Sequence, residues 1–132
     1  DRIREVFEAV SGGRDAAIQR VQDAVGKGQE LRGCDVDDAA REHIAGKGFG
    51  EFFIHRTGHS LGREVHGNGA NMDNLETQDE RRLLPNTAFT IEPGVYLPEF
   101  GIRSEVDLYI GKNGVEVTGQ PIQTEVLPLL KN

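Results

Sequence analysis

The first third of the chain has the spacing of amphipathic helices. Over residues 1–25 apolar positions recur every three or four residues, which predicts one long helix with an apolar stripe. Those positions are Ile3, Val6, Phe7, Val10, Ala17, Ile18, Val21, Ala24 and Val25. Gly12 and Gly13 each weaken a helix by about 1 kcal/mol relative to alanine, which leaves a break or kink there open. Gly26 and Gly28 are expected to end the helix.

A second, shorter helix is predicted over residues 36–46. Its apolar side is formed by Val36, Ala39, Ala40, His43 and Ile44. Asp35 is the expected N-cap, and Asp37 and Asp38 are interpreted as further acids favoured near a helix N-terminus. Gly46 is expected to end this helix.

After residue 48 the pattern changes to short apolar runs of the kind that form strands. These runs are Phe49–Ile54, Glu64–His66, Ala88–Ile91, Gly94–Leu97, Ile102–Ile110, Val115–Thr118 and Gln123–Leu130. Residues 67–79 are rich in Gly, Asn and Asp and predict a surface loop, and residues 76–82 predict a solvated charged segment. Residues 112–114 are typical of a hairpin turn. Two helices followed by an antiparallel sheet give an α+β fold class.

Composition narrows the class of protein further. The 132 residues suffice for one compact domain, and a net charge of −7 disfavours nucleic acid as a partner. No run of about 18 apolar residues is present, so no membrane partner is expected. The single Cys34 fits a reducing compartment, from which we expect a cytoplasmic location. Because Asp1 opens directly into a helical pattern, we expect the chain to be an excerpt of a longer protein.

Three histidines, His55, His59 and His66, lie within twelve residues. The four-residue spacing of the first two would suit a helical zinc motif, but Gly58 and Gly62 disfavour a helix there. The glycines instead indicate bent backbone packed close to a ligand or metal. An ordinary structural role, with each histidine simply hydrogen-bonded, remains the alternative.

Two glutamates follow in separate strand-like runs. Glu92 ends an apolar run, where a charged side chain is costly to bury unless it is paired or binds a metal. In a strand, Arg103, Glu105 and Asp107 share one face, and a solvated pair of Arg103 with Glu105 is the alternative reading. Together, His59, Glu92 and Glu105 predict a metal site whose oxygen and imidazole ligands come from different strands.

Three segments of the chain resemble the sequence motifs of the pita-bread metallopeptidases, the family of methionine aminopeptidase, aminopeptidase P, prolidase and the metal-free creatinase. These segments are His55–His66, Phe89–Tyr96 and Gly101–Glu105. The resemblance implies that residues 1–132 are a single partial domain. That domain would be the C-terminal half of the catalytic domain, with two helices followed by a curved antiparallel sheet. The details of the two glutamate motifs favour the aminopeptidase P and prolidase branch.

The resemblance implies a dinuclear metal site. His59 and Glu92 would each bind a metal ion, and Glu105 would bridge two ions. The reaction would be attack by a metal-bridged hydroxide on a peptide carbonyl, removing N-terminal residues or cleaving dipeptides of the Xaa-Pro type. Oxygen-rich ligation with one imidazole suits Mn best, with Co, Zn or Fe as alternatives.

The resemblance also implies roles around the metals. His66 would contact the substrate and stabilise the tetrahedral intermediate, and His55 would line the substrate pocket. Tyr96 and Arg103 would belong to the polar network along the proton path.

Departures from the family pattern set limits on these expectations. The family supplies two further aspartate ligands from a strand upstream of the first helix, and no aspartate of this chain stands in a matching motif. The chain would then hold three of five ligands, so we expect it to be metal-free or to bind metal weakly, and not to catalyse alone. Ser60, Gly67 and Val106 also differ from the residues common in the family, which leaves substrate choice open.

Partners follow from the same reasoning. We expect a peptide substrate, and self-association or association with a missing N-terminal half across an apolar face. A non-catalytic pita-bread binding module and a metal-free hydrolase of the creatinase type remain alternatives. The presence of all three visible ligands argues against both of them.

Overall fold

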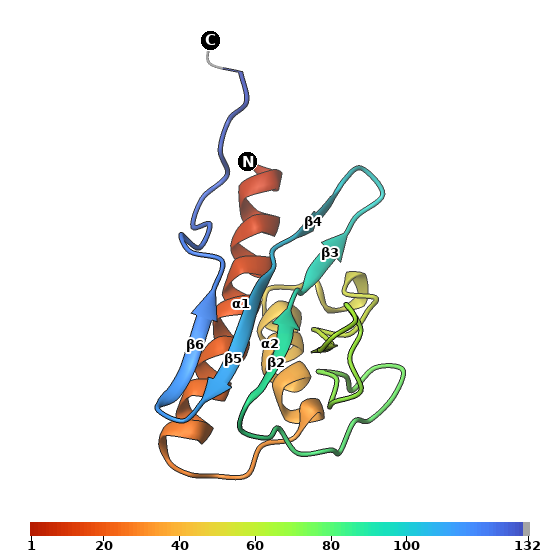
Figure 1. The fold of residues 1–132 in the computed structure, drawn as a ribbon. Helices are drawn as coiled ribbons and strands as arrows, with labels where there is room; N and C mark the ends of the chain where they lie inside the picture. Colours follow the sequence, from red (N-terminus) through yellow and green to blue (C-terminus); the bar gives the residue numbers. More distant parts are fainter. Residues whose placement is uncertain (131–132) are drawn as a thin grey trace.

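Two helices cover one face of an antiparallel sheet in the computed structural model, which describes residues 1–130 (Figure 1). The helices are α1 (Arg2–Gly26) and α2 (Gly33–Gly46), and a 3-10 turn, η1 (Gly50–Phe52), follows them. The strands are β1 (Ser60–Leu61), β2 (Thr87–Ile91), β3 (Gly94–Tyr96), β4 (Gly101–Arg103), β5 (Val106–Gly111) and β6 (Gly114–Thr118). The prediction of an α+β fold with two N-terminal helices before an antiparallel sheet is therefore confirmed.

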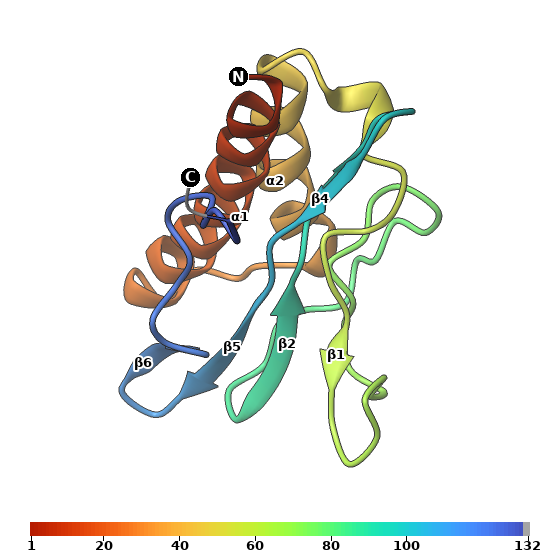
Figure 2. The ribbon, with the colours of Figure 1, turned by 90° about the horizontal axis from the view of Figure 1, so that it is seen from above.

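The main sheet has the strand order β1-β2-β5-β6, with every neighbouring pair antiparallel. Seen from above, the four strands form one row and both helices lie on the same side of it (Figure 2). Strands β3 and β4 pair separately as a two-stranded ribbon. Alternate residues of the main sheet, including Phe89, Ile91, Leu108 and Ile110, join the buried core.

Helix α1 runs without a break through Gly12 and Gly13. A Cβ atom on Gly13 would lie 2.8 Å from Cγ1 of Ile44, and one on Gly12 would overlap the imidazole of His43. The two glycines therefore let α1 and α2 approach closely, and this packing stabilises the helix where propensity alone leaves a kink open.

Helix α2 begins three residues earlier than predicted, because Arg32 and not Asp35 is the N-cap. The Asp35 carboxylate instead accepts the backbone N–H of Arg32 at 2.9 Å. Two further N–H groups of the first turn, those of Gly33 and Cys34, donate to carbonyls of Arg81 and Asp79. The prediction of a purely solvated segment over residues 76–82 is therefore wrong, because two carbonyls of this segment cap α2.

Three predicted strands are wrong. The run Phe49–Ile54 forms the turn η1, since a helical turn buries Phe49 and Phe53 together on one side. The run Glu64–His66 is an exposed loop with Val65 71% exposed, so no buried face stabilises a strand there. The run Gln123–Leu130 pairs with no strand, and the side chains of its leucines are exposed. The last two residues of the expected domain, 131 and 132, lie outside the described residues.

The predicted run Ile102–Ile110 is divided between two sheets. Its first part is β4, which pairs with β3, and its second part is β5, which pairs with β2. At the junction, the hydroxyl of Ser104 accepts a hydrogen bond of 2.7 Å from the guanidinium of Arg14, a buried residue of α1. The chain therefore changes sheets immediately before Glu105. Neither helix within residues 1–130 has the length and apolar content of a membrane span.

Candidate metal centre

The candidate site lies on the sheet face turned away from the helices. In the register of the main sheet, Thr90 is opposite Asp107, and Ser60 is opposite Phe89. His59 extends the row of Thr90 and Asp107, while Phe89 points to the core. The strands thus place an imidazole and a carboxylate on the same uncovered face.

His59 is held in one orientation by its neighbours. Its backbone N–H donates to the hydroxyl of Thr90 at 3.0 Å, and its carbonyl accepts the N–H of Thr90 at 2.9 Å. Its Nδ1 lies 3.0 Å from the carbonyl oxygen of Ser60. Since a carbonyl only accepts, Nδ1 carries a proton, and Nε2 is the nitrogen that has the lone pair in the neutral imidazole. The buried imidazole therefore presents a free nitrogen to the sheet face.

Glu92 is the centre of the predicted trio. Its Oε2 lies 3.7 Å from Nε2 of His59, and its Oε1 lies 3.9 Å from a guanidinium nitrogen of Arg103. Burial raises the pKa of Glu105, and a hydrogen bond and charge repulsion from Glu92 raise it further. Glu92 therefore faces His59 directly, and its charge also acts on the Glu105 carboxylate.

A third carboxylate joins this cluster. The pKa of Asp107 is raised by burial and then by the negative charge of Glu92, with His59 acting in the opposite direction. Asp107 lies in β5, two residues after Glu105, and the sequence predicted that these two residues share a face. The place of Asp107 beside Glu92, however, depends on the pairing of β2 with β5. Crowded carboxylates whose protonated forms are favoured are an environment that a cation would relieve.

The donor types of this cluster fit a divalent cation that prefers oxygen and imidazole ligands. Within residues 1–130, however, no group of three or more His, Cys, Asp or Glu side chains is arranged to hold a metal ion. The described chain thus brings suitable ligands together but does not complete a metal site by itself.

A hydrogen-bonded chain lies beside the carboxylates. Arg103 donates from Nε to the hydroxyl of Tyr96 at 2.9 Å, and that hydroxyl lies 2.8 Å from Nε2 of His55. Nδ1 of His55 lies 2.7 Å from the carbonyl of Arg56, so Nδ1 holds the proton and Nε2 accepts from Tyr96. Burial lowers the pKa of His55, and the positive charge of Arg103 lowers it further against the opposing hydrogen bond to Arg56. Neutral His55 is therefore the favoured form.

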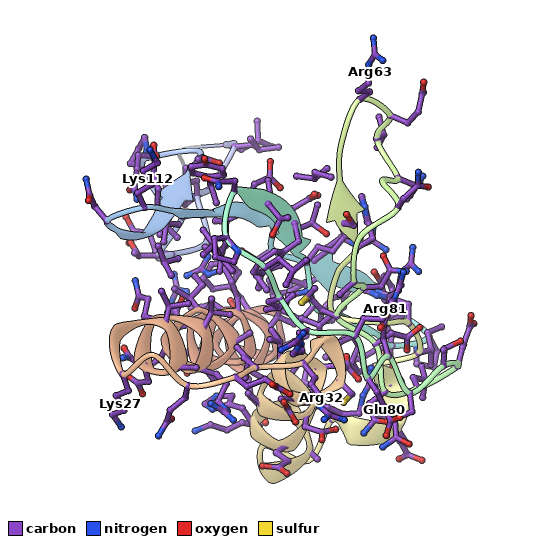
Figure 3. The ribbon with its side chains drawn as sticks, turned by 60° about the horizontal axis from the view of Figure 1, so that its bottom comes forward. Lys27, Arg32, Arg63, Glu80, Arg81 and Lys112 are labelled. Carbon is purple, nitrogen blue, oxygen red and sulfur yellow. The ribbon has the colours of Figure 1, made fainter. Side chains whose placement is uncertain are left out.

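His66 lies on the exposed loop that follows β1. Its ring centroid is 4.3 Å from that of His59, with an angle of 49° between the rings. The loop residues Gly62–Glu64 and His66–Asn68 line an open cavity of 530 Å³, and Arg63 stands at the tip of the loop, far from the body of the protein (Figure 3). His66 therefore lies between the buried imidazole and open solvent.

Two residues of α2, Asp37 and Arg41, bind the backbone of the segment carrying His55 and were not identified from the sequence. Asp37, interpreted as a helix-capping residue, is instead fully buried inside α2 and accepts hydrogen bonds from Thr57. Arg41 of the same helix donates to the carbonyl of His55 at 2.8 Å. The one available signal was the four-residue spacing of Asp37 and Arg41, which places them on one helix face.

Comparison with known proteins gives the class. The model of metallopeptidase family M24 matches residues 1–112, which include all of the predicted site residues. The chain therefore belongs to metallopeptidase family M24, and the resemblance read from its motifs is confirmed.

Individual relatives agree with this assignment. The chain is 34% identical over 131 residues to the Xaa-Pro dipeptidase of Lactobacillus delbrueckii subsp. lactis, covering 98% of this chain and 33% of that protein. It is 34% identical over 115 residues to the uncharacterized peptidase YqhT of Bacillus subtilis, covering 86% of this chain and 30% of that protein. The chain thus spans about a third of the length of the curated relatives that it matches.

Solved structures show the same fold. The dipeptidase PepE of Mycobacterium ulcerans superimposes with a TM-score of 0.79 at 30% identity, covering 97% of this chain and 32% of that one. The X-Pro aminopeptidase of Thermotoga maritima gives a TM-score of 0.78 at 35% identity, covering 96% and 34%. The fold is therefore one part of the pita-bread architecture of the prolidases and aminopeptidases P.

Proposed function

We propose that this chain is the part of a dinuclear metallopeptidase that supplies three of its metal ligands, and that the whole protein cleaves peptides of the Xaa-Pro type. The observation that carries the proposal is the approach of Glu92 to Nε2 of His59, at 3.7 Å, together with the effect of the Glu92 charge on Glu105. Relatives described as Xaa-Pro dipeptidases support the substrate class.

In this proposal His59, Glu92 and Glu105 would hold two divalent ions, Mn most favourably, with Co, Zn or Fe as alternatives. The ions would supply activation of the attacking water and polarisation of the scissile carbonyl. The chain's own part is to orient the His59 ring through the Nδ1 hydrogen bond to Ser60, so that Nε2 is the nitrogen available as a ligand.

The polar residues beside the ligands would bind the substrate and carry protons. His66, exposed next to His59, would contact the substrate carbonyl and its tetrahedral intermediate. His55 would line the substrate pocket and hold a proton acceptor at Nε2, toward which Tyr96 donates. Arg103 would fix the Tyr96 hydroxyl and balance the charge of Glu92.

We further propose that the 132-residue chain alone has little or no peptidase activity, because its described residues complete no metal-holding group. The uncovered sheet face would be occupied by an N-terminal half or by a second copy. A cytoplasmic location remains a prediction that rests on the single, buried Cys34.

Calorimetry with Mn²⁺ and Co²⁺ tests the proposal, on this chain and on a chain extended upstream by about one domain's length. We expect binding by the longer chain only, with cleavage of Xaa-Pro peptides that a chelator abolishes. Glu92→Gln should remove both, whereas Glu116→Gln, on the distant edge strand β6, should remove neither. Absence of binding in both chains would overturn the peptidase proposal and favour a binding module, or a metal-free hydrolase if cleavage persists.

A further inference from the structure

The carboxylate of Asp37 in α2 is fully buried next to the segment that carries His55 and His59. It is not one of the residues of the candidate site. The two oxygens of Asp37 accept five hydrogen bonds, although the residue has 0% exposure. Two come from the backbone N–H and the hydroxyl of Thr57, at 2.9 and 2.7 Å. Two come from Arg41, and the fifth comes from the backbone N–H of Asn74. A buried charge is tolerated only when it is satisfied in this way.

Arg41 extends this support to the segment that carries His55. Its guanidinium donates to the carbonyls of Phe53 and His55, each at 2.8 Å, and lies 4.0 Å from the centre of the Phe53 ring. The planar guanidinium thus binds the Asp37 carboxylate on one side and two carbonyls of the histidine segment on the other.

Thr57 connects the same carboxylate to the glutamate strand. Its carbonyl accepts the backbone N–H of Glu92 at 2.6 Å. Two residues further on, the backbone of His59 pairs with Thr90, two residues before Glu92. The position of Thr57 therefore determines how the backbones of His59 and Glu92 meet.

We infer that Asp37 and Arg41 are positioning residues: Asp37 sets His59 and Glu92 relative to one another through Thr57, and Arg41 positions His55 through its backbone carbonyl. Neither residue touches the candidate ligands, so their action is through the backbone. All five donors to Asp37 come from Arg41, from Thr57, which lies two residues before His59, or from Asn74 in the loop after β1. A carboxylate that served only helix stability would not need these distant backbone partners.

Nuclear magnetic resonance of the folded 132-residue chain tests the inference without requiring peptidase activity. The readouts are the imidazole signals of His55 and His59 and the exchange rate of the Glu92 amide proton. In Asp37→Asn, an NH2 group replaces one acceptor oxygen, so we expect both imidazoles to shift and the Glu92 amide to exchange at least tenfold faster.

Two milder variants test the contact of Asp37 with Thr57 and the contact of Arg41 with the His55 carbonyl separately. They also keep the test decisive if Asp37→Asn does not fold. Thr57→Val removes one donor to Asp37 and should shift His59 and accelerate exchange at Glu92, leaving His55 unchanged. Arg41→Lys removes the two-carbonyl contact and should shift His55, leaving the Glu92 amide unchanged.

Val21→Ala is the matched control, since it removes buried volume from α1 without touching Asp37 or its partners. It should lower the melting temperature and leave all three readouts as in the wild type. The inference is overturned if Thr57→Val lowers the melting temperature without changing the signals of His59 and Glu92. It is also overturned if Val21→Ala shifts them to the same extent. Failure of the peptidase proposal would leave these results unaffected.

Discussion

The hydroxyl of Tyr96 lies between Nε2 of His55 and Nε of Arg103, at 2.8 Å from the first and 2.9 Å from the second. Since Arg103 only donates, the hydroxyl accepts from Arg103 and donates to His55. The ring of Tyr96 reaches this position because Gly94 has no Cβ, and a Cβ there would lie 2.6 Å from the hydroxyl oxygen. Gly94 in the β3–β4 ribbon thus leaves room for the Tyr96 hydroxyl, which connects His55 to Arg103.

Tyr96→Phe should therefore remove the hydroxyl donor to Nε2 of the half-buried His55 and the acceptor for Nε of the exposed Arg103. We expect a loss of about 1 kcal/mol in the free energy of unfolding, measured by urea denaturation. The matched control is Tyr109→Phe, because the hydroxyl of Tyr109 is exposed and makes one long hydrogen bond of 3.3 Å to Asn86. That control should be nearly neutral, and an equal loss in the two variants would contradict the role of the Tyr96 hydroxyl.

The lowered pKa of His55 gives a prediction on pH. Burial is the main cause and the charge of Arg103 adds to it, so the folded pKa lies below the ordinary value of 6.5. The unfolded chain then binds the extra proton more readily, and the contribution of His55 to stability is complete above pH 6.5 and declines as the pH falls below it. Titration of the His55 imidazole should show this lowered pKa, and Arg103→Gln should bring it closer to 6.5. An unchanged or lower pKa in Arg103→Gln would contradict the assigned cause.

Gly58→Ala should disturb the site directly. A Cβ on Gly58 would overlap the backbone carbonyl of Thr90, the residue whose hydroxyl and amide hold His59. We expect a loss of about 2 kcal/mol or more in unfolding free energy, with displaced imidazole signals of His59. Gly62→Ala in the same motif is the control, since its Cβ would make only an ordinary contact of 3.4 Å. Equal tolerance of alanine at both positions would show that the approach of the two strands is looser than described.

In Gly13→Ala, the effect of alanine on helix propensity is stabilising, whereas its effect on packing against α2 is destabilising. Alanine favours the helix by about 1 kcal/mol, but its Cβ would lie 2.8 Å from Ile44, so we expect a net destabilisation of about 1–2 kcal/mol in thermal or urea unfolding. Gly26→Ala, at the open end of the same helix, meets no atom within 4 Å and should be neutral or slightly stabilising. A stabilised Gly13→Ala variant would refute close packing as the reason for the glycine.

Asp79 gives the second dependence on pH. Its hydrogen bond to Arg81 lowers its pKa from 3.8 to about 2, with burial opposing the change. Because the folded pKa is depressed, the stabilisation is complete above pH 4 or so and is lost as the pH falls toward 2. We expect Asp79→Asn to lose about 1–2 kcal/mol at pH 7, a figure reduced because Arg81 is half exposed, and to lose less at pH 2. The exposed neighbour Glu80 supplies the control Glu80→Gln, and a loss independent of pH would assign the effect to shape instead of charge.

Much of the fold was predictable because apolar spacing reports burial directly. The stripe of α1 and the alternation of Phe89 with Ile91 both describe a face that packs on a core. The strand prediction for Phe49–Ile54 was wrong because a short apolar run fits a buried turn equally well, and only tertiary contacts decide. The break before Glu105 was missed because it depends on Arg14, ninety residues away in sequence.

The candidate site was predictable to the extent that it lies in short motifs. His55, His59, His66, Glu92 and Glu105 were singled out from their residue types and neighbouring glycines, whereas Tyr96 and the role of Arg103 came from the resemblance of the motifs. The structure places Glu92 directly after β2 and Glu105 directly before β5. Asp37 and Arg41 were not found, because a buried ion pair on a helix has the same sequence pattern as a surface pair. Burial and the partners of Thr57 separate the two cases, and neither is visible in the sequence.

The close contact of the two helices has a consequence for how this protein can change over evolution. Residues 12 and 13 leave room that residues 43 and 44 fill, so the volumes at the two pairs of positions are constrained as a sum. A larger residue at position 13 should be found together with a smaller one at position 44, and isoleucine at 44 together with glycine at 13. An alignment of family members should therefore show these positions varying jointly, although they are separated by some thirty residues and include none of the candidate site residues.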